Sequence, residues 1–303
     1  MPSLVALVMT VHNRENYLKC ALDSILLQTY PHWHLTIWDD GSTDTSPDIA
    51  HEYAKLDPRI RFIQANHAGQ THSLHAAMMA IRPCLVLPNL NAEETSAQSV
   101  AGSPSSSVPT SAKPCLDALN LEGMCNYFGW VDSDDILTPD ALATTVAILD
   151  EKPEIGMVYT DHRLIDPSGR DLGIGPRCHI PYSKERLLID FMTFHFRLIR
   201  WELYDAVGGI DLEIPHVQDY DLCLKLSEVT EIYHHQAALY SYRVHPTMIS
   251  STQKAQLNAG TAIAVRNALV RRGLSERYRL DVTPDARFKL VPCLPDPTNL
   301  PKI

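Results

Sequence analysis

Acidic residues follow two strand-like segments of this sequence, where they could hold a phosphate-bearing ligand through a metal ion. Asp39 and Asp40 close one of these segments. Asp132, Asp134 and Asp135 close another. Carboxylate oxygens are the hard ligands that Mg²⁺ and Mn²⁺ prefer, and a bound cation lets carboxylates hold a diphosphate that they would otherwise repel. Asp also suits a turn or a helix N-cap, so the cluster by itself leaves both interpretations open.

The segments around these residues alternate between strand and helix patterns. Leu4–Met9 is a near-continuous apolar run, which is typical of a strand buried on both faces of a parallel sheet. Asn16–Leu27 then carries apolar residues at helical spacing, Leu35–Trp38 is a second strand, and Ser46-Pro47 opens a second helix. This alternation predicts an α/β fold, in which ligands bind beyond the carboxyl ends of the strands.

The alternation breaks over residues 84–124, which hold no sustained period and include the Pro- and Ser-rich stretch 101–112. We expect a flexible insertion in a surface loop there, because the strand pattern resumes at Tyr127–Val131. The expected organisation is one domain over residues 1–250, followed by a C-terminal helix and a weakly ordered tail over residues 251–303.

Composition narrows the class of protein. Of the 303 residues, 45% are hydrophobic and 20% are charged, as in water-soluble globular proteins. The net charge of −10 argues against a dedicated nucleic-acid binder, which usually shows a basic face. No apolar run reaches about 18 residues, and the N-terminus lacks the basic start of a signal peptide, so we expect no integral membrane segment. Seven scattered cysteines suit reduced thiols and a protein that is cytoplasmic, or peripheral at the inner face of the membrane.

Eight short motifs, each modest alone, follow one another along the chain. They are Met9–Glu15, Ser24–Thr29, Trp38–Asp44, Asn66–Gly69, Gly129–Asp135, Gly208–Asp211, Gln218–Leu222 and Tyr242–Pro246. In this order they resemble the glycosyltransferase family 2 enzymes, from Val5 to about Ser250. The resemblance implies a GT-A type, Rossmann-like three-layer α/β/α sandwich with a mostly parallel central sheet. It also implies an inverting transferase that uses a nucleotide-sugar donor.

The resemblance assigns a set of residues to the donor nucleotide. They are Thr10, Val11, His12, Asn13, Asp39, Asp40, Asp132 and Ser133. Asp40, with Asp39, matches the carboxylate that reads the nucleotide base. A carboxylate can accept the imide N–H of uracil, so UDP-sugars are the expected donor class. Asp132 matches the first carboxylate of the D-x-D motif, which usually faces the ribose or the sugar.

The same resemblance implies the cation site and the base. Asp134 matches the last carboxylate of the D-x-D motif, Asp135 is a second candidate in a shifted register, and His245 matches a residue that assists the metal in some relatives. The expected cofactor is Mn²⁺ or Mg²⁺. Asp219 matches the catalytic base, and it also suits the N-cap of a helix near Tyr220. One base suffices because the leaving group is a nucleoside diphosphate, whose charge a metal can stabilise.

The expected partners are a nucleotide-sugar donor and a hydroxyl acceptor, which is a glycan, a lipid-linked glycan or another molecule. Polysaccharide biosynthesis is one expected context. Gln70 and Thr71 depart from the family pattern, which often has a basic residue near the phosphates, so a non-catalytic nucleotide-sugar or carbohydrate binding protein stays an alternative. A sugar nucleotidyltransferase is the other, although Met9–Glu15 lacks the glycine of its phosphate loop. The aromatic stretch Phe191–Phe196 is interpreted as core packing, with His195 facing the acceptor pocket as the competing interpretation.

Overall fold

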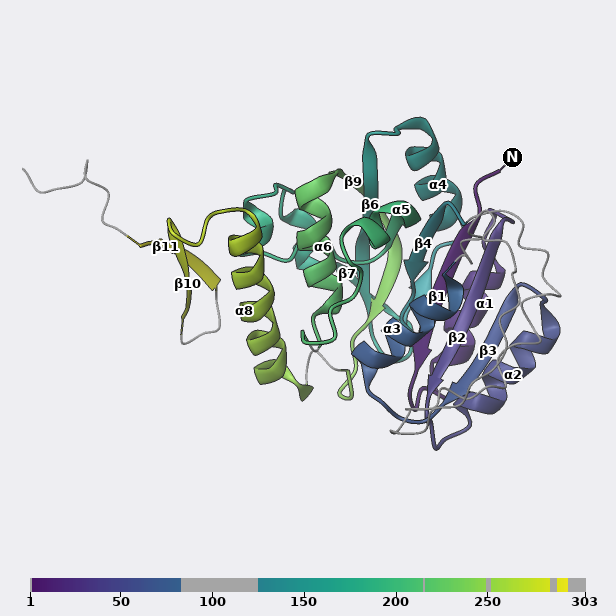
Figure 1. Cartoon of the computed structure of the whole chain (residues 1–303). Coiled ribbons are helices and arrows are strands. Elements are labelled where there is room, and N and C mark those ends of the chain that lie inside the picture. The colour runs from purple at the N-terminus through teal and green to yellow at the C-terminus, as the bar shows by residue number, and fades with distance from the viewer. Residues whose placement is uncertain (1, 83–124, 215, 249–251, 284–287, 294–303) are drawn as a thin grey trace, which may run out of the picture. The chain divides into compact units, whose positions relative to one another are not determined.

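The computed structural model describes residues 2–82, 125–214, 216–248, 252–283 and 288–293 (Figure 1). The described sheet and helices belong to one unit of the chain, which comprises residues 1–81 and 125–303. The insertion predicted over residues 84–124 lies outside the described residues.

A nine-stranded sheet forms the centre of this unit. Its strands are β1 (Val5–Val11), β2 (Trp33–Asp40), β3 (Ile60–Ala65), β4 (Tyr127–Trp130), β5 (Ile136–Leu137), β6 (Ile155–Ile165), β7 (Asp171–Ile174), β8 (Arg197–Arg200) and β9 (Glu231–Arg243). Their order is β3-β2-β1-β4-β8-β6-β9-β5, with β7 paired to β6. Strands β3, β2, β1, β4, β6 and β9 run in one direction, and β5, β7 and β8 run against them. The predicted mostly parallel sheet is therefore confirmed.

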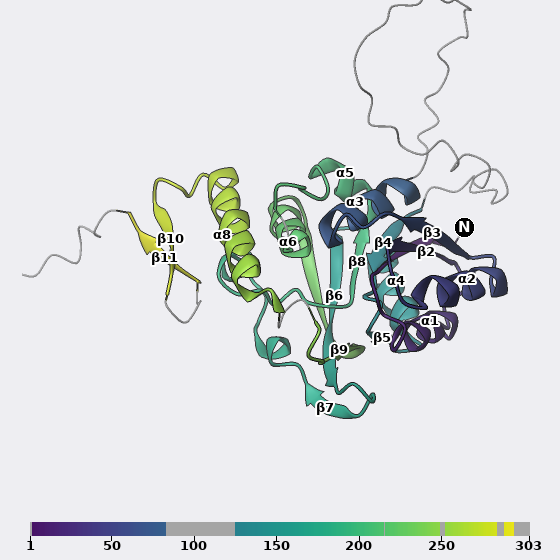
Figure 2. The same cartoon turned by 90° about the horizontal axis from the view of Figure 1, so that it is seen from below.

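Helices cover both faces of the sheet, which confirms the three-layer arrangement (Figure 2). One layer holds α1 (Leu18–Leu26), α2 (Ser46–Leu56) and α4 (Ala141–Glu151). The other holds α3 (Gln70–Ile81), α5 (Trp201–Ala206), α6 (Gln218–Val229) and α8 (Lys254–Arg271). Two short 3-10 turns, η2 (Pro176–His179) and η3 (Arg186–Leu188), precede β8.

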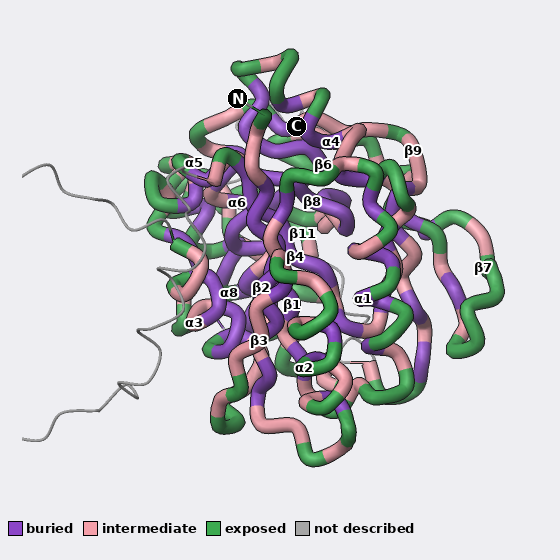
Figure 3. Tube along the Cα trace, turned by 90° about the vertical axis from the view of Figure 1, so that its right-hand side faces the viewer, coloured by how far each residue is buried: buried purple, intermediate pink, exposed green. Residues whose placement is uncertain are grey.

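Strand β1 explains why the sheet is buried on both sides. Side chains alternate between the two faces of a strand. Val5, Leu7 and Met9 therefore enter the core beneath α1, whereas Ala6 and Val8 enter the core beneath α3. Figure 3 shows the buried stretches running through the central strands. The continuous apolar run in the sequence follows from this double burial.

The chain after α8 is more regular than we expected. β10 (Tyr278–Val282) and β11 (Phe288–Pro292) form an antiparallel hairpin where weak order was predicted. Leu280 and Leu290 pack against the same core as α6 and α8, and this contact stabilises the hairpin. The domain limits near residue 250 stay a prediction. In the part of the chain that is described, no helix is long and apolar enough to cross a membrane.

Candidate active site

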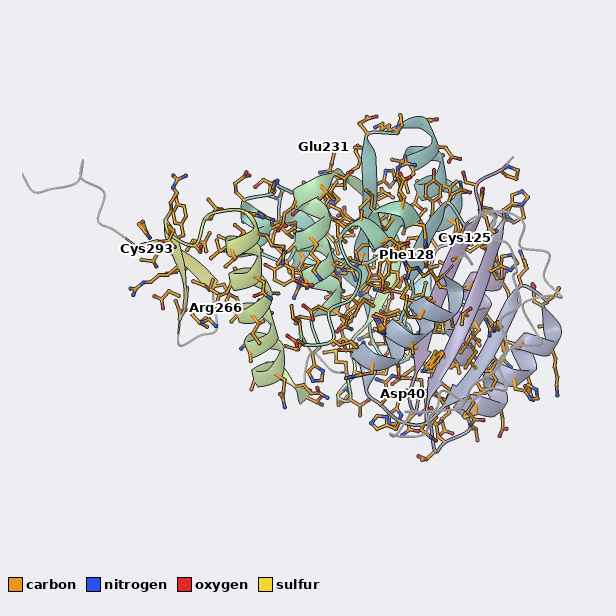
Figure 4. The ribbon with its side chains drawn as sticks, in the orientation of Figure 1. Asp40, Cys125, Phe128, Glu231, Arg266 and Cys293 are labelled. Atoms are coloured by element: carbon orange, nitrogen blue, oxygen red, sulfur yellow. The ribbon has the colours of Figure 1, made fainter. Side chains whose placement is uncertain are left out.

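The parallel strands β1, β2 and β4 end at one edge of the sheet, and Asp40 at the end of β2 marks that edge (Figure 4). A cavity of about 1180 Å³ opens there. Eight of the predicted site residues line it, namely Thr10, Val11, His12, Asp40, Asp132, Ser133, Asp134 and Asp219. Asp219 reaches the cavity from the start of α6, so the fold brings the predicted base to the predicted metal motif.

Asp134 is held at the cavity by two basic side chains. Its Oδ2 accepts a hydrogen bond from Nε of Arg14 at 3.0 Å and lies 3.0 Å from Nε2 of His245. Burial acts to raise the pKa of Asp134, but the hydrogen bond to His245 and the charge of Arg14 outweigh it and hold the pKa below the usual value. The carboxylate is therefore ionised at neutral pH.

The pair Asp134 and His245 fits a divalent cation. Two ligands at right angles, each about 2.1 Å from an octahedral ion, are about 3.0 Å apart. The oxygen and nitrogen of this pair are separated by that distance. Nδ1 of His245 lies 2.9 Å from Oγ1 of Thr247, which orients the ring. A cation would compete with Arg14 for the same carboxylate oxygen.

Two of the predicted acidic residues do not line the cavity. Asp135 is buried, and its Oδ1 accepts the backbone N–H of Arg243 at 2.7 Å, which ties the loop after β4 to β9. Burial, with the nearby Asp134 and Asp132 carboxylates, raises the pKa of Asp135 well above its usual range. Asp39 is fully buried and accepts the backbone N–H of Ser42 at 3.1 Å. Both buried carboxylates therefore stabilise backbone segments at this edge by hydrogen bonds from the protein interior.

Asp40 braces the neighbouring loop while it faces the cavity. Its two carboxylate oxygens accept the backbone N–H groups of Ala68 and Gly69, at 2.6 and 3.0 Å. The rings of His12 and His67 lie 4.4 Å apart, and Nδ1 of each ring lies within 3.1 Å of the Asp40 carbonyl oxygen. Within the described ranges, these three side chains form the one group of three or more His, Cys, Asp or Glu residues whose ligand atoms lie close enough together to suit a metal ion. The sequence analysis did not anticipate His67.

Asn13 and Gly41 set the shape of the loops beneath His12. Asn13 has a positive φ of 53°, and its Oδ1 accepts the backbone N–H of Thr43 at 2.8 Å. Gly41 has φ +67°, and a Cβ there would lie 2.6 Å from the backbone nitrogen of His67. The predicted nucleotide residue Asn13 therefore acts as a link between the β1 and β2 loops, and Gly41 lets the His67 backbone approach.

Gly41→Ala is expected to destabilise the protein by more than the ~1–2 kcal/mol that left-handed backbone costs an L-residue, because the new Cβ also meets the His67 backbone. Gly69→Ala is the matched control. Gly69 has φ +89° but no atom within 4 Å of an added Cβ, so only the backbone cost applies. Urea unfolding of both variants measures the difference. Equal losses would show that the close approach at Gly41 does not matter.

A buried chain of polar side chains joins Asp132 to Asp219. Oδ2 of Asp132 lies 3.3 Å from Nε2 of His195, and Nδ1 of His195 lies 3.4 Å from Nη2 of Arg197. The same Nη2 donates to Oδ2 of Asp219 at 3.1 Å. Burial, together with the charges of Asp134 and Asp219, raises the pKa of Asp132 to about 7. The pKa values of Asp132 and Asp134, which line one cavity, are therefore shifted in opposite directions, as those of acid and base groups in active sites often are.

Asp132→Asn is expected to stabilise the protein at alkaline pH. A carboxyl whose pKa is raised to about 7 contributes stability that is present below pH ~4 and is lost as the pH rises through 7. The side chain is 33% exposed, so after allowance for solvent screening the gain is about 1–2 kcal/mol at pH 8 relative to pH 4. Urea unfolding in EDTA at both pH values measures it. A gain that is the same at both pH values would contradict the raised pKa.

Several basic and aromatic residues of the cavity were missed or misjudged. Arg14 was quoted within a motif but received no role. Arg197 carried a visible signal, because it is a single cation in the apolar segment Phe196–Ile199. Phe191, Phe194 and His195 line the cavity, so the interpretation of that stretch as core packing holds only in part. Phe196 is fully buried, as core packing requires.

Comparison with known proteins finds a family model and several sequence relatives that match this chain. The family model for glycosyl transferase family 2 matches residues 6–83, which run from β1 to the end of α3. The chondroitin synthase of Escherichia coli is 28% identical over 242 residues, or 80% of this chain and 29% of that protein. The hyaluronan synthase of Pasteurella multocida is 24% identical over 272 residues, or 90% of this chain and 24% of that protein. The chain therefore spans about a quarter of the length of these relatives.

Solved structures share the fold of this chain. S. aureus TarS 1–349 in complex with UDP-GlcNAc gives a TM-score of 0.62 at 15% identity, covering 90% of this chain and 70% of that one. The mannosyltransferase PcManGT from Pyrobaculum calidifontis in complex with GDP-Man and Mn²⁺ gives 0.55 at 14% identity, covering 90% of this chain and 64% of that one. The expected GT-A fold is thereby confirmed. The family model for glycosyl transferase family 2 therefore matches the part of the chain from β1 to α3, and the sequence relatives match most of the length of this chain.

Proposed function

We propose that the chain is a metal-dependent, inverting glycosyltransferase that moves a sugar from a nucleotide-sugar donor to a hydroxyl acceptor. One observation carries this proposal: a single cavity is lined both by Asp134, which pairs with His245, and by Asp219 on α6. Cation binding and proton abstraction are the two tasks that such a transfer needs. The names of the sequence relatives, a chondroitin synthase and a hyaluronan synthase, support an activity of this kind.

Asp134 and His245 are the residues that would hold Mn²⁺ or Mg²⁺. Their 3.0 Å separation supports this assignment, and Asp135 is the weaker candidate because its carboxylate is committed to the Arg243 backbone. A bound cation would offset the negative charge of the diphosphate leaving group. Arg14, which pairs with Asp134, is then free to contact a phosphate oxygen.

Asp219 is the proposed base. Its carboxylate takes the proton of the acceptor hydroxyl, the hydroxyl oxygen forms a bond to the anomeric carbon, and the bond from that carbon to the phosphate oxygen breaks. The nucleoside diphosphate leaves with the electron pair. Attack opposite the leaving group inverts the anomeric configuration, so a second carboxylate nucleophile is not needed.

The donor is proposed to be UDP-linked, with the base near Asp40. The rings of His12 and His67, which lie 4.4 Å apart and are tilted by 31° to each other, offer aromatic surface beside Asp40 at that end of the cavity. The TarS complex with UDP-GlcNAc supports a UDP-sugar, whereas the mannosyltransferase complex with GDP-Man keeps GDP-sugars as the comparison to test. The acceptor is proposed to be a glycan, and Phe191, Phe194 and Tyr242 supply aromatic surface elsewhere in the cavity.

Release of nucleoside diphosphate from a panel of UDP-, GDP- and dTDP-sugars tests the proposal. Many transferases hydrolyse their donor slowly without an acceptor, so glycan fragments are added only as a second arm. We expect release from a UDP-sugar with Mn²⁺ and none with EDTA. If every donor stays intact with and without acceptors, and calorimetry detects no UDP binding, the chain is not a transferase of this class.

A further inference from the structure

The buried chain from Asp132 to Asp219 runs through two side chains that the proposed reaction does not use. His195 and Arg197 are 7% and 3% exposed, and both lie at or next to the start of β8. Nη1 of Arg197 donates to the carbonyl oxygen of Thr193 at 2.9 Å, and the guanidinium lies 5.7 Å from the ring centre of Trp130. Arg197 therefore has little freedom to move.

The hydrogen atoms shared by these four side chains, from Asp132 through His195 and Arg197 to Asp219, have one consistent arrangement. A guanidinium only donates hydrogen bonds, so the two hydrogens of Arg197 Nη2 serve Oδ2 of Asp219 and Nδ1 of His195. Nδ1 of His195 is then an acceptor, and the ring proton sits on Nε2, facing Oδ2 of Asp132. Burial, with the charge of Arg197, holds the pKa of His195 well below its usual range, so the ring is neutral.

Arg197 is also the cation in direct contact with Asp219. Among the described residues, four charged or titratable groups interact electrostatically with Asp219, namely Asp132, Arg177, Arg197 and Cys223. Only Arg197 forms an ion pair with it in that part of the chain. Asp219 would otherwise face the like charge of Asp132 across the cavity without a hydrogen-bonded counter-charge.

We propose that Arg197 and His195 are positioning residues, which fix the place of the Asp219 carboxylate beside its counter-charge and hold Asp132 at a set place across the cavity. This inference rests on the proposed function of Asp219. Strand β8 runs antiparallel to its neighbours β4 and β6. Its first residue, Arg197, would carry the counter-charge of the base, which gives this strand a role in the active site. Neither residue needs to touch the sugar or the nucleotide.

The first test needs no activity. ¹⁵N NMR of the substrate-free protein reports which nitrogen of each imidazole carries the proton, and the His195 signals are identified by their loss in His195→Gln. We expect a neutral ring with its proton on Nε2 in the wild type, and a mixture of tautomers in Arg197→Met. A wild-type proton on Nδ1, or an Arg197→Met spectrum with unchanged His195 signals, overturns the proposal.

The second test compares kinetics with an active donor. In Arg197→Met we expect kcat to fall by at least about 100-fold, with the donor KM nearly unchanged, because an unfixed base loses most of its 10²–10⁴-fold contribution. Arg197→Lys keeps the charge and is expected to recover part of the lost kcat.

Arg200→Met is the matched control, because Arg200 lies on the same strand and donates to the carbonyl oxygens of Leu149, Lys152 and Ile155, not to Asp219. It is expected to lower stability while leaving kcat of the folded protein near the wild-type value. An unchanged kcat in folded Arg197→Met, or a loss as large in folded Arg200→Met, contradicts the positioning role. If the wild type turns over no donor, the proposed function fails, and the NMR arm still decides the geometry.

Discussion

Asp219→Asn is expected to lower kcat for sugar transfer by about 10²–10⁴-fold, the contribution typical of a positioned general base. The amide cannot take the acceptor proton, yet it fills the same space at the start of α6 and can still accept a hydrogen bond from Arg197. Binding of UDP and Mn²⁺ is expected to stay close to that of the wild type. Initial rates of nucleoside diphosphate release with acceptor, together with calorimetry, separate the two effects.

Asp221→Asn is the matched control for this variant. Asp221 lies two residues further along α6, is fully buried, and has Oδ2 2.7 Å from Nζ of Lys225. Its loss is expected to lower the free energy of unfolding by up to ~3 kcal/mol, because it removes the buried counter-charge of Lys225, whose Nζ then keeps its hydrogen bond to the carbonyl oxygen of Gly209. Turnover by the folded variant should remain near the wild-type value. A fully active Asp219→Asn would remove Asp219 from the mechanism.

Asp134→Ala is expected to abolish cation-dependent turnover and to weaken Mn²⁺ binding by at least about 100-fold. The substitution removes the oxygen that faces His245, so one of the two proposed ligands is lost. Isothermal titration of Mn²⁺ in the presence of UDP measures the affinity. Activity that remains, and still needs Mn²⁺, would place the cation on other residues.

The variant Asp135→Asn tests whether Asp134 or Asp135 is the metal ligand of the D-x-D motif. Burial is the main cause that raises the pKa of Asp135 well above its usual range, which favours the neutral form of its carboxyl group. The neutral amide of Asn is therefore a close substitute for it. The amide oxygen can accept the Arg243 N–H in the same way. We therefore expect Mn²⁺ affinity and turnover close to the wild type. A loss as large as that of Asp134→Ala would show that the motif uses its last carboxylate.

The sequence predicts the architecture because buried parallel strands and amphipathic helices have clear periods. The apolar run of β1 and the acidic ends of β2 and β4 were enough to place Asp40, Asp132 and Asp134 at one edge. Asp219 could be placed with them only by resemblance, because it follows the metal motif by about 85 residues and no local period connects the two. The reversed direction of β8 likewise depends on long-range pairing with β4 and β6.

Side-chain partners were harder to predict than backbone elements. Asp39 and Asp135 have the right residue type at the right spacing. A one-residue step along β2 turns the side chain of Asp39 from the cavity to the interior. Asp135 lies in the turn after β4, and its carboxylate binds the backbone N–H of Arg243 instead. The Arg197–His195 link depends on a contact between β8, β4 and α6, and only the isolated Arg in an apolar segment hinted at it. The hairpin of β10 and β11 was missed because its order comes from Leu280 and Leu290 packing on a distant core.

Anomalous X-ray diffraction from crystals of the full chain grown with UDP and Mn²⁺ would locate both the cation and the nucleotide. We expect a manganese peak within bonding distance of Asp134 Oδ2 and His245 Nε2, with Asp219 facing the same cavity and the uracil near Asp40. A peak held instead by His12, Asp40 and His67, the other cluster able to bind a metal in the described chain, would contradict it. So would UDP bound outside this cavity.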